Sequence, residues 1–271
     1  MNTQIYYFSG TGNSLHIARE LQKRLGNTDL IPMVGAMNSN KLATKADAVG
    51  FIFPIHCLGI PIFVKNILHA INLQSASYLF AVASRECSAK VFSEINRSIS
   101  RQGKKLDACF SVQMPETYLP VFEVDNEYEI AEKETRMLKQ LDSIQSIISN
   151  RERYEKPDPK TFAMFLYYIL RPVVMFIFSK TGYFRLGNRF YADAKCSGCG
   201  ICSRICPADR IEMRGDRPTW NRKIQCMYCF ACLHYCPQQA VQIKKSKTPV
   251  RGRYHHPEVS AEEIIMQRNG P

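Results

Sequence analysis

Two copies of one cysteine motif lie near the C-terminal end of the chain. Each copy has three cysteines separated by two residues and a fourth cysteine three residues later, directly before a proline. The copies are CSGCGICSRICP at 196–207 and CMYCFACLHYCP at 226–237. Three thiolates at this spacing can wrap one corner of an iron–sulfur cubane. The pattern therefore predicts two [4Fe–4S] clusters.

The fourth cysteine of such a motif ligates the cluster of the other copy. The predicted ligands of cluster 1 are Cys196, Cys199, Cys202 and Cys236, and those of cluster 2 are Cys226, Cys229, Cys232 and Cys206. Zinc and disulfides are the competing interpretations. A structural zinc site needs pairs of cysteines and no third cysteine at the same two-residue spacing. Disulfides need an oxidising compartment. The duplicated four-cysteine motif favours iron and sulfide.

Residues 190–245, with these motifs, resemble a bacterial two-cluster ferredoxin. An apolar residue, Ile211 or Val241, follows each fourth cysteine where that family has a strand. The resemblance implies a small α+β domain, placed here at 188–245, that transfers single electrons at low potential. We expect the aromatic residues of this segment to pack around the clusters; they are Tyr191, Trp220, Tyr228 and Phe230.

A second chemical motif lies at the other end of the chain. Small residues follow a predicted strand, Gln4–Phe8, and lead into an amphipathic helix; they are Ser9, Gly10, Thr11, Gly12, Asn13 and Ser14. Glycine turns, hydroxyls and free N–H groups at a helix N-terminus form an anion site. A dinucleotide loop needs a third glycine, where Leu15 stands, and a P-loop needs a lysine. A monophosphate remains, which suits FMN.

The elements needed to hold this loop can be predicted from hydrophobic periodicity. Apolar runs alternate with amphipathic stretches over residues 1–150, which is typical of a parallel sheet covered by helices. The predicted strands are Gln4–Phe8, Asp29–Met33, Ala48–Phe53, Tyr78–Ala83 and Ala108–Gln113, and helices begin near Asn13, Pro61, Ala89 and Glu129. Cys109 lies inside a strand and is predicted to be a core residue.

Phe8–Ser14 resembles the phosphate loop of flavodoxins, and residues 1–150 resemble that family at the level of the fold. The resemblance implies a doubly wound, five-stranded parallel sheet in the order 2-1-3-4-5. It also implies that two later loops contact the flavin, at Pro54, Ile55, His56, Cys57, Leu58 and Gly59 and at Ser84, Arg85 and Glu86. Neither loop contains the aromatic residues that flavodoxins stack on the flavin.

Three residues of these loops are candidates for chemistry beside the flavin. His56, Cys57 and Cys87 are able in principle to donate a proton or to react there. Free cysteine is also commonly a small buried apolar residue, so the alternative interpretation, which is the favoured one, is that the three simply line the loops. The sequence leaves both interpretations open.

Two segments fall outside these units. Residues 151–187 are predicted to be a helical linker or cap. They contain an apolar run, Phe162–Phe178, that is shorter than the ~20 residues of a membrane span and is interrupted by Arg171. It is expected to pack between the domains, with a partner surface or a membrane surface as alternatives. The second segment is a basic tail, 246–271. The stretch Lys244–His256, which leads into it, has five Lys or Arg and no acid, and this predicts a solvated segment or a docking strip for an acidic partner.

The composition bounds the remaining possibilities. Eight of the 11 cysteines lie between Cys196 and Cys236, and the N-terminus lacks the pattern of a secretory signal, so a cytoplasmic location is expected. The net charge is +12. Scattered basic residues without a recognition motif argue against nucleic acid. They favour an acidic redox partner or an anionic substrate.

The whole chain resembles the flavodoxin–ferredoxin fusion proteins of anaerobic bacteria. The resemblance implies an electron carrier in which two [4Fe–4S] clusters exchange electrons with FMN. The alternative is an FMN-dependent reductase of a small organic substrate that receives its electrons through the clusters. A scaffold without cofactors is a third interpretation, and the duplicated cysteine motif argues against it.

Overall fold

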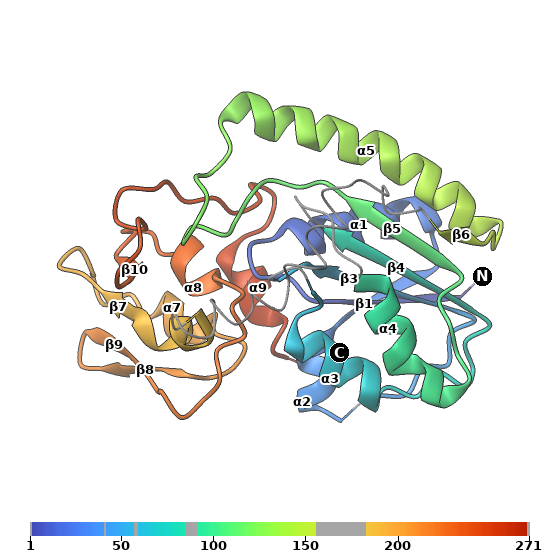
Figure 1. Ribbon diagram of the computed structural model, residues 1–271, viewed down its shortest axis with the longest axis horizontal. Helices are drawn as coiled ribbons and strands as arrows, with labels where there is room; N and C mark the ends of the chain where they lie inside the picture. The colour runs from blue at the N-terminus through green and yellow to red at the C-terminus, as the bar shows by residue number, and fades with distance from the viewer. Residues whose placement is uncertain (1, 41, 57–58, 85–90, 156–182, 270–271) are drawn as a thin grey trace, which may run out of the picture.

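The computed structural model describes residues 2–40, 42–56, 59–84, 91–155 and 183–269 (Figure 1). Several predicted features lie outside these ranges. They are the apolar run Phe162–Phe178 and the flavin-loop residues Cys57, Leu58, Arg85, Glu86 and Cys87. The described residues form a large α/β part and a smaller cysteine-rich part, which lie side by side in Figure 1.

A parallel sheet organises the N-terminal part. Its strands are β1 (Thr3–Tyr7), β2 (Thr28–Pro32), β3 (Ala48–Pro54), β4 (Tyr78–Ser84), β5 (Ala108–Val112) and β6 (Tyr154–Glu155). They run in the order β2-β1-β3-β4-β5-β6. The first five have the flavodoxin-like order 2-1-3-4-5, which confirms the predicted fold class. The sixth strand was not predicted: it is two residues long, pairs with β5 and lies in the segment predicted to be a linker.

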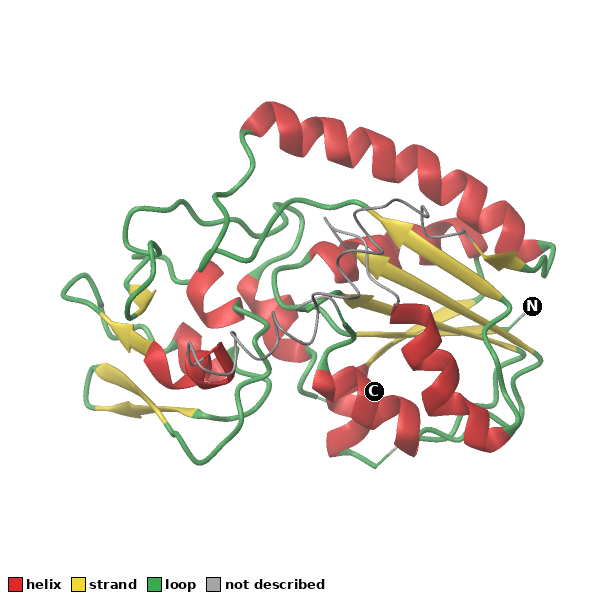
Figure 2. Ribbon diagram, viewed as in Figure 1, coloured by secondary structure: helices red, strands yellow, loops and turns green. Residues whose placement is uncertain are grey.

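Helices cover both faces of this sheet (Figure 2). Helices α1 (Asn13–Leu25) and α5 (Glu127–Ser149) pack on one face, and α2 (Met33–Asn38), α3 (Ile62–Ala70) and α4 (Val91–Ile99) pack on the other. Side chains of a strand point alternately to the two faces. In β1, Ile5 and Tyr7 accordingly enter the α1/α5 core, whereas Tyr6 enters the opposite core. Cys109 is buried, as predicted.

The cysteine-rich part is a small α+β unit with a core of its own. Strand β7 (Phe190–Ala192) pairs with β10 (Val241–Ile243), and β8 (Ile211–Arg214) pairs with β9 (Arg217–Trp220). Two one-turn helices, α7 (Ile201–Arg204) and α8 (Ala231–His234), lie between the strands, and η2 (Tyr183–Arg189) precedes them. This arrangement is the predicted ferredoxin-like domain. Its core contains Phe230 and, partly buried, Trp220 and Tyr228, while Tyr191 packs under the Lys244 ammonium.

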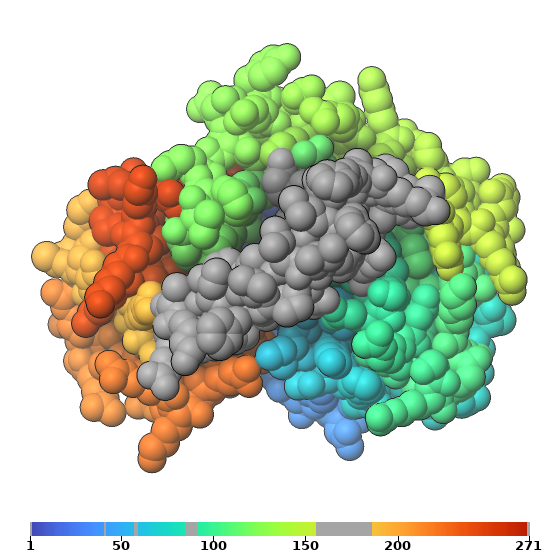
Figure 3. Space-filling model, viewed as in Figure 1, coloured from blue at the N-terminus to red at the C-terminus, as the bar shows by residue number. Residues whose placement is uncertain are grey.

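The prediction of a solvated basic tail is wrong. Thr248, Arg251, Tyr254 and His256 are buried, and helix α9 (Ala261–Met266) adds Ile264 to the α1/α5 core. The Arg251 guanidinium donates to the Leu119 carbonyl and pairs with Glu123. In Figure 3 this red segment adjoins the orange cysteine-rich part and the green residues that precede α5. The tail therefore fastens the two parts together.

No helix within the described residues is both long enough and apolar enough to cross a membrane.

Candidate iron–sulfur and phosphate sites

The structure gathers four cysteines from both motifs around one cavity. We call this group the first cysteine cage, Cys196, Cys199, Cys202 and Cys236; Met213, Pro218 and Val241 are among the other residues that line the cavity. Cys199 is exposed to solvent, so the first cage lies at the surface of the molecule. These are the four residues predicted to share cluster 1.

The other four motif cysteines surround a second cavity. We call this group the second cysteine cage, Cys206, Cys226, Cys229 and Cys232; Phe190, Arg210, Trp220 and Phe230 are among the residues that line it. Here too one cysteine comes from the opposite motif. The structure thus brings together both of the crossed sets that the spacing predicts.

The two motifs repeat the same backbone geometry. Left-handed residues stand two positions after the first cysteine (Gly198, φ 73; Tyr228, φ 53) and directly after the second (Gly200, φ 72; Phe230, φ 56). Such a conformation is unfavourable for residues with a Cβ atom. The loop turns the Tyr228 amide toward Cys226 Sγ, at 3.4 Å. A further amide, that of Ala240, lies 3.2 Å from Cys236 Sγ. Amide donors of this kind favour the anionic, ligating form of sulfur.

Burial disfavours the thiolate form of these cysteines unless a cation is present. It raises the pKa of Cys202 to about 12 and also raises the pKa values of Cys206 and Cys232. Neighbouring thiols act in the same direction, and for Cys202 they include Cys236 from the other motif. Metal ligands must be thiolates, so a bound cationic core is what makes deprotonation favourable in these cages.

The predicted phosphate loop joins β1 to α1 and is buried. Ser9, Thr11, Asn13 and Ser14 are each less than a tenth exposed. Gly12 precedes α1 with φ 95, and this helix has neither a capping side chain nor an acid in its first turn. No described side chain caps the first N–H groups of α1, and such a helix N-terminus with its positive dipole end can bind an anion. The described loop fits a phosphate.

A second predicted loop meets the phosphate loop. The Ser14 and Ser84 hydroxyl oxygens lie 2.8 Å apart, so the end of β4 adjoins the start of α1. Pro54 at the end of β3 pairs with Ser84 in the sheet, and His56 beyond it pairs with Gly59 through an isolated antiparallel bridge. The described residues of the three predicted flavin-binding segments thus lie at one edge of the sheet. Ile55 packs against the core on the α2–α4 face.

The second cysteine cage lies directly against these loops. A Cβ atom added to Gly10 would be 2.1 Å from the Cys229 carbonyl oxygen. The backbone of Met227, which lies between two cage cysteines, hydrogen-bonds to His56. Burial lowers the pKa of His56 to about 4, an effect larger than the opposing influence of that hydrogen bond. The phosphate loop and one cage are therefore in contact through their backbones.

The C-terminal tail covers the phosphate loop from the other side. The Gln267 amide accepts from Ser9 N–H and donates to the Ser9 carbonyl, both at 3.0 Å. The Tyr254 hydroxyl donates to the Asn13 side chain at 3.0 Å, and the His256 N–H donates to the Thr11 carbonyl at 2.8 Å. These contacts hold the loop in a fixed conformation.

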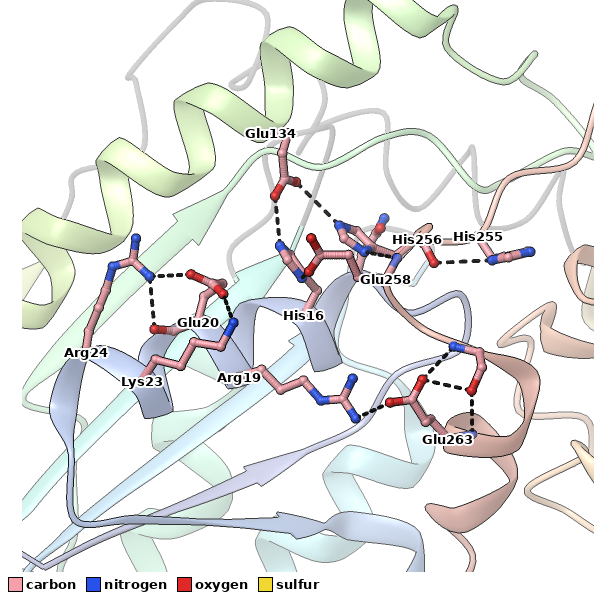
Figure 4. Close-up of polar contacts among 12 residues, drawn as sticks. His16, Arg19, Glu20, Lys23, Arg24, Glu134, His255, His256, Glu258 and Glu263 are labelled. Carbon is pink, nitrogen blue, oxygen red and sulfur yellow. Dashed lines mark hydrogen bonds and ion pairs between the residues drawn. The ribbon is translucent and has the colours of Figure 1, made fainter.

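A group of polar side chains built around two buried histidines anchors the tail to α1 and α5 (Figure 4). The His16 and His256 rings stack with centroids 3.7 Å apart. Glu134 lies 2.8 Å from His16 Nε2 and 3.4 Å from His256 Nε2. The other ring nitrogen of His16 faces Glu258 at 3.3 Å, and that of His256 accepts from the Glu258 N–H. Each ring nitrogen has a protein partner, so these residues form a complete hydrogen-bonded anchor.

Replacing Glu134 with glutamine is expected to weaken this anchor. Burial acts to raise the pKa of Glu134, but hydrogen bonds and charge from His16 and His256 outweigh it and lower the pKa to about 2. The carboxylate thus stabilises the fold fully above pH 4.5, and this contribution is lost as the pH falls toward 2. A double-mutant cycle of Glu134→Gln with His16→Gln, followed by chemical unfolding at pH 7, should give a coupling of about 1–2 kcal/mol. Additive effects would contradict this account of the anchor.

Two functional contacts were not predicted from the sequence, and only the first of them had no signal there. The tail's hold on the phosphate loop joins Ser9 to Gln267, 258 positions apart. Arg210, which lines the second cage, had a signal in the repeat: it stands where the other motif has Ala240. Aligning the two motifs on their fourth cysteines would have found it.

The solved structures that this chain resembles are distant and cover little more than half of it. The Trp repressor binding protein of Bacillus subtilis has a TM-score of 0.35 at 10% identity and covers 58% of this chain and 99% of its own. An FMN-dependent NADH-azoreductase of Bacillus anthracis has a TM-score of 0.32 at 10% identity and covers 54% and 98%. Likeness at this level carries no information on activity. The strand order itself is the basis for the fold class.

The cysteine-rich part has much clearer relatives. Residues 195–241 match the 4Fe-4S dicluster domain. A ferredoxin of Methanothermococcus thermolithotrophicus is 32% identical over 53 residues, which are 19% of this chain and 88% of that protein. An uncharacterized ferredoxin of Methanocaldococcus jannaschii is 33% identical over 54 residues, 20% and 87% of the two chains. The C-terminal part of this chain therefore belongs to the 4Fe-4S ferredoxin family.

Proposed function

We propose that this chain is an electron carrier in which two [4Fe–4S] clusters, held in the two cysteine cages, communicate with FMN held at the β1–α1 loop. The observation that carries the proposal is the contact of the second cage with that loop, through the Cys229 carbonyl at Gly10 and the Met227 backbone at His56. Electron tunnelling falls steeply with distance. A backbone contact between the two sites is therefore the arrangement that such a carrier needs.

Separate residues have separate tasks in this proposal. When bound, the clusters would supply one-electron transfer and FMN the ability to accept one or two electrons. The cage thiolates hold the clusters, and the amides of Tyr228 and Ala240 donate to their sulfurs. The Ser9–Ser14 loop and the first turn of α1 hold the phosphate. The tail covers this loop on one side, which excludes water from it.

The exposed Cys199 indicates where an outside protein would deliver or collect electrons. The first cage is at the surface, whereas the second faces the phosphate loop. Two clusters of charge −2 and an FMN phosphate of about −2 reduce the net charge of +12 to about +6. A basic protein associates fastest with an acidic one, so a ferredoxin-type protein is the partner that we propose.

Rapid mixing tests this function against the alternative of a reductase. The protein is first reduced without oxygen and is then mixed either with an acidic ferredoxin or with small quinones and azo dyes. A carrier should reoxidise with the ferredoxin at a rate that falls as salt is added, because charge pairing steers the encounter. Fast multiple turnover of an organic acceptor, with no exchange with the ferredoxin, would instead establish a reductase.

A further inference from the structure

An arginine is buried beside the second cysteine cage. Arg210 is only 2% exposed. Its backbone N–H donates to the sulfur of Cys206, its charge interacts with that sulfur, and Arg210 is among the residues that line the cage. A Cβ atom added to Gly187 would lie 2.6 Å from Cys226 Cβ and 2.7 Å from Arg210 Nη1. Only a glycine leaves room for the guanidinium at this place.

The positive charge of Arg210 lacks a counter-ion among the described residues. Its Nη2 donates to two neutral acceptors, Asn188 Oδ1 at 3.4 Å and the Asn221 carbonyl at 3.1 Å. Its Nε has no hydrogen-bond acceptor in the part of the chain that the structure describes. A buried guanidinium without an anionic partner is strongly unfavourable. A [4Fe–4S] core of charge 2+ with four thiolates has a net charge of −2 and would supply that partner.

Among the described residues, no arginine buried as deeply as Arg210 lines the first cage. The residue that corresponds to Arg210 is Ala240, which repeats the backbone hydrogen bond to sulfur without a charged side chain. Arg253 is only partly buried and interacts with Cys236 and also with the Asp193 carboxylate. Asp216 packs on the same motif, at Gly198. The electrostatic surroundings of the two cages are therefore unequal.

We propose that Arg210 sets the order of the two reduction potentials, so that the cluster in the second cage is the more easily reduced of the pair. One electron from an outside ferredoxin-type donor changes that cluster core from 2+ to 1+ and its total charge from −2 to −3. A buried cation stabilises the −3 state more than the −2 state, which raises the potential. Electrons then collect at the cage that touches the phosphate loop.

This inference rests on the proposed function for its clusters, but not for its flavin. The substitution Arg210→Gln removes the charge and keeps a side chain that can hydrogen-bond, and Arg210→Lys keeps the charge. Arg214→Ala is the matched control, since Arg214 lies on the adjoining strand β8, is 76% exposed and pairs only weakly with Glu212, at 3.9 Å. Each protein is titrated anaerobically with a mediator set and followed by low-temperature EPR.

The wild type should show two cluster transitions. In Arg210→Gln the one at higher potential should become harder to reduce by tenfold or more, which is 59 mV for one electron, while the other changes less than threefold. In Arg210→Lys the potential of that transition should stay close to the wild-type value. Arg214→Ala should leave the potentials of both transitions unchanged. Arg210→Gln could lose one cluster, which is about four irons. In that case a normal iron content and a normal potential in Arg210→Lys would still show that the charge is what matters.

Three results would overturn the inference. One is that neither transition moves in Arg210→Gln, the second is that both move equally, and the third is that the transition at lower potential moves. A protein that shows no cluster transition at all contradicts the proposed function itself, which is a separate outcome.

Discussion

Replacing Cys206 with serine is expected to remove about four of the eight irons that two [4Fe–4S] clusters contain, and to remove them from the cage that faces the phosphate loop. Cys206 lies in the first motif, but its sulfur shares a cavity with Cys226, Cys229 and Cys232 of the second. Its loss leaves that cluster with three ligands. The remaining cluster, beside the exposed Cys199, should still be reduced by an outside donor but should pass electrons to FMN at least tenfold more slowly.

The matching substitution, Cys236→Ser, should have the opposite result. It removes a ligand of the first cage and should leave communication between the remaining cluster and FMN intact. Cys109→Ala is the control, because Cys109 is a buried residue of β5 outside both cages and should keep all of its iron. Iron analysis and stopped-flow reduction of each protein give the comparison. The crossed arrangement is contradicted if Cys206→Ser spares flavin reduction and Cys236→Ser abolishes it.

Replacing Gly10 with alanine should disrupt the contact between the phosphate loop and the second cage. The added Cβ atom would lie 2.1 Å from the Cys229 carbonyl oxygen, which is a backbone atom and cannot rotate away. Overpacking of this kind costs about 1–3 kcal/mol. We expect the two parts to separate slightly, which should slow flavin reduction through the clusters by tenfold or more.

Gly50→Ala distinguishes this effect from a general loss of stability. Its added Cβ would lie 2.3 Å from the Phe80 ring, inside the sheet and away from both cages. It should therefore lower the free energy of unfolding by a similar amount and leave electron transfer close to that of the wild type. Chemical unfolding and stopped-flow spectroscopy measure the two quantities separately. If flavin reduction slowed equally in both variants, the contact at Gly10 would have no specific role in electron transfer between the sites.

Much of the fold could be predicted because it is encoded in local patterns. The first five strands begin and end within about one residue of their predicted limits, since apolar runs such as Ala48–Pro54 are buried on both faces of the sheet and so are almost wholly apolar. The cysteine cages could be predicted because covalent spacing limits which sulfurs can meet. Both kinds of information are contained in a few neighbouring residues.

The tail and the sixth strand could not be predicted in this way. The basic stretch that begins the tail looks solvated by composition, yet Arg251 and Tyr254 are buried because the Leu119 carbonyl and the Asn13 side chain receive their hydrogen bonds. Strand β6 is only two residues long, which is too short to show the alternating pattern of a strand. It is specified by its pairing with β5. Partners distant in the sequence decide both elements: Ala108 pairs with Tyr154 of β6, and Leu119 and Asn13 are each more than 100 positions from the tail residues that they bind.

One measurement tests the central claim most directly: the iron, acid-labile sulfide, zinc and flavin content of the protein purified without oxygen. The account predicts about eight irons, eight sulfides and one FMN per chain, with a brown solution that bleaches on reduction. Zinc in the two cages, or cysteines joined as disulfides in a colourless protein, would contradict it.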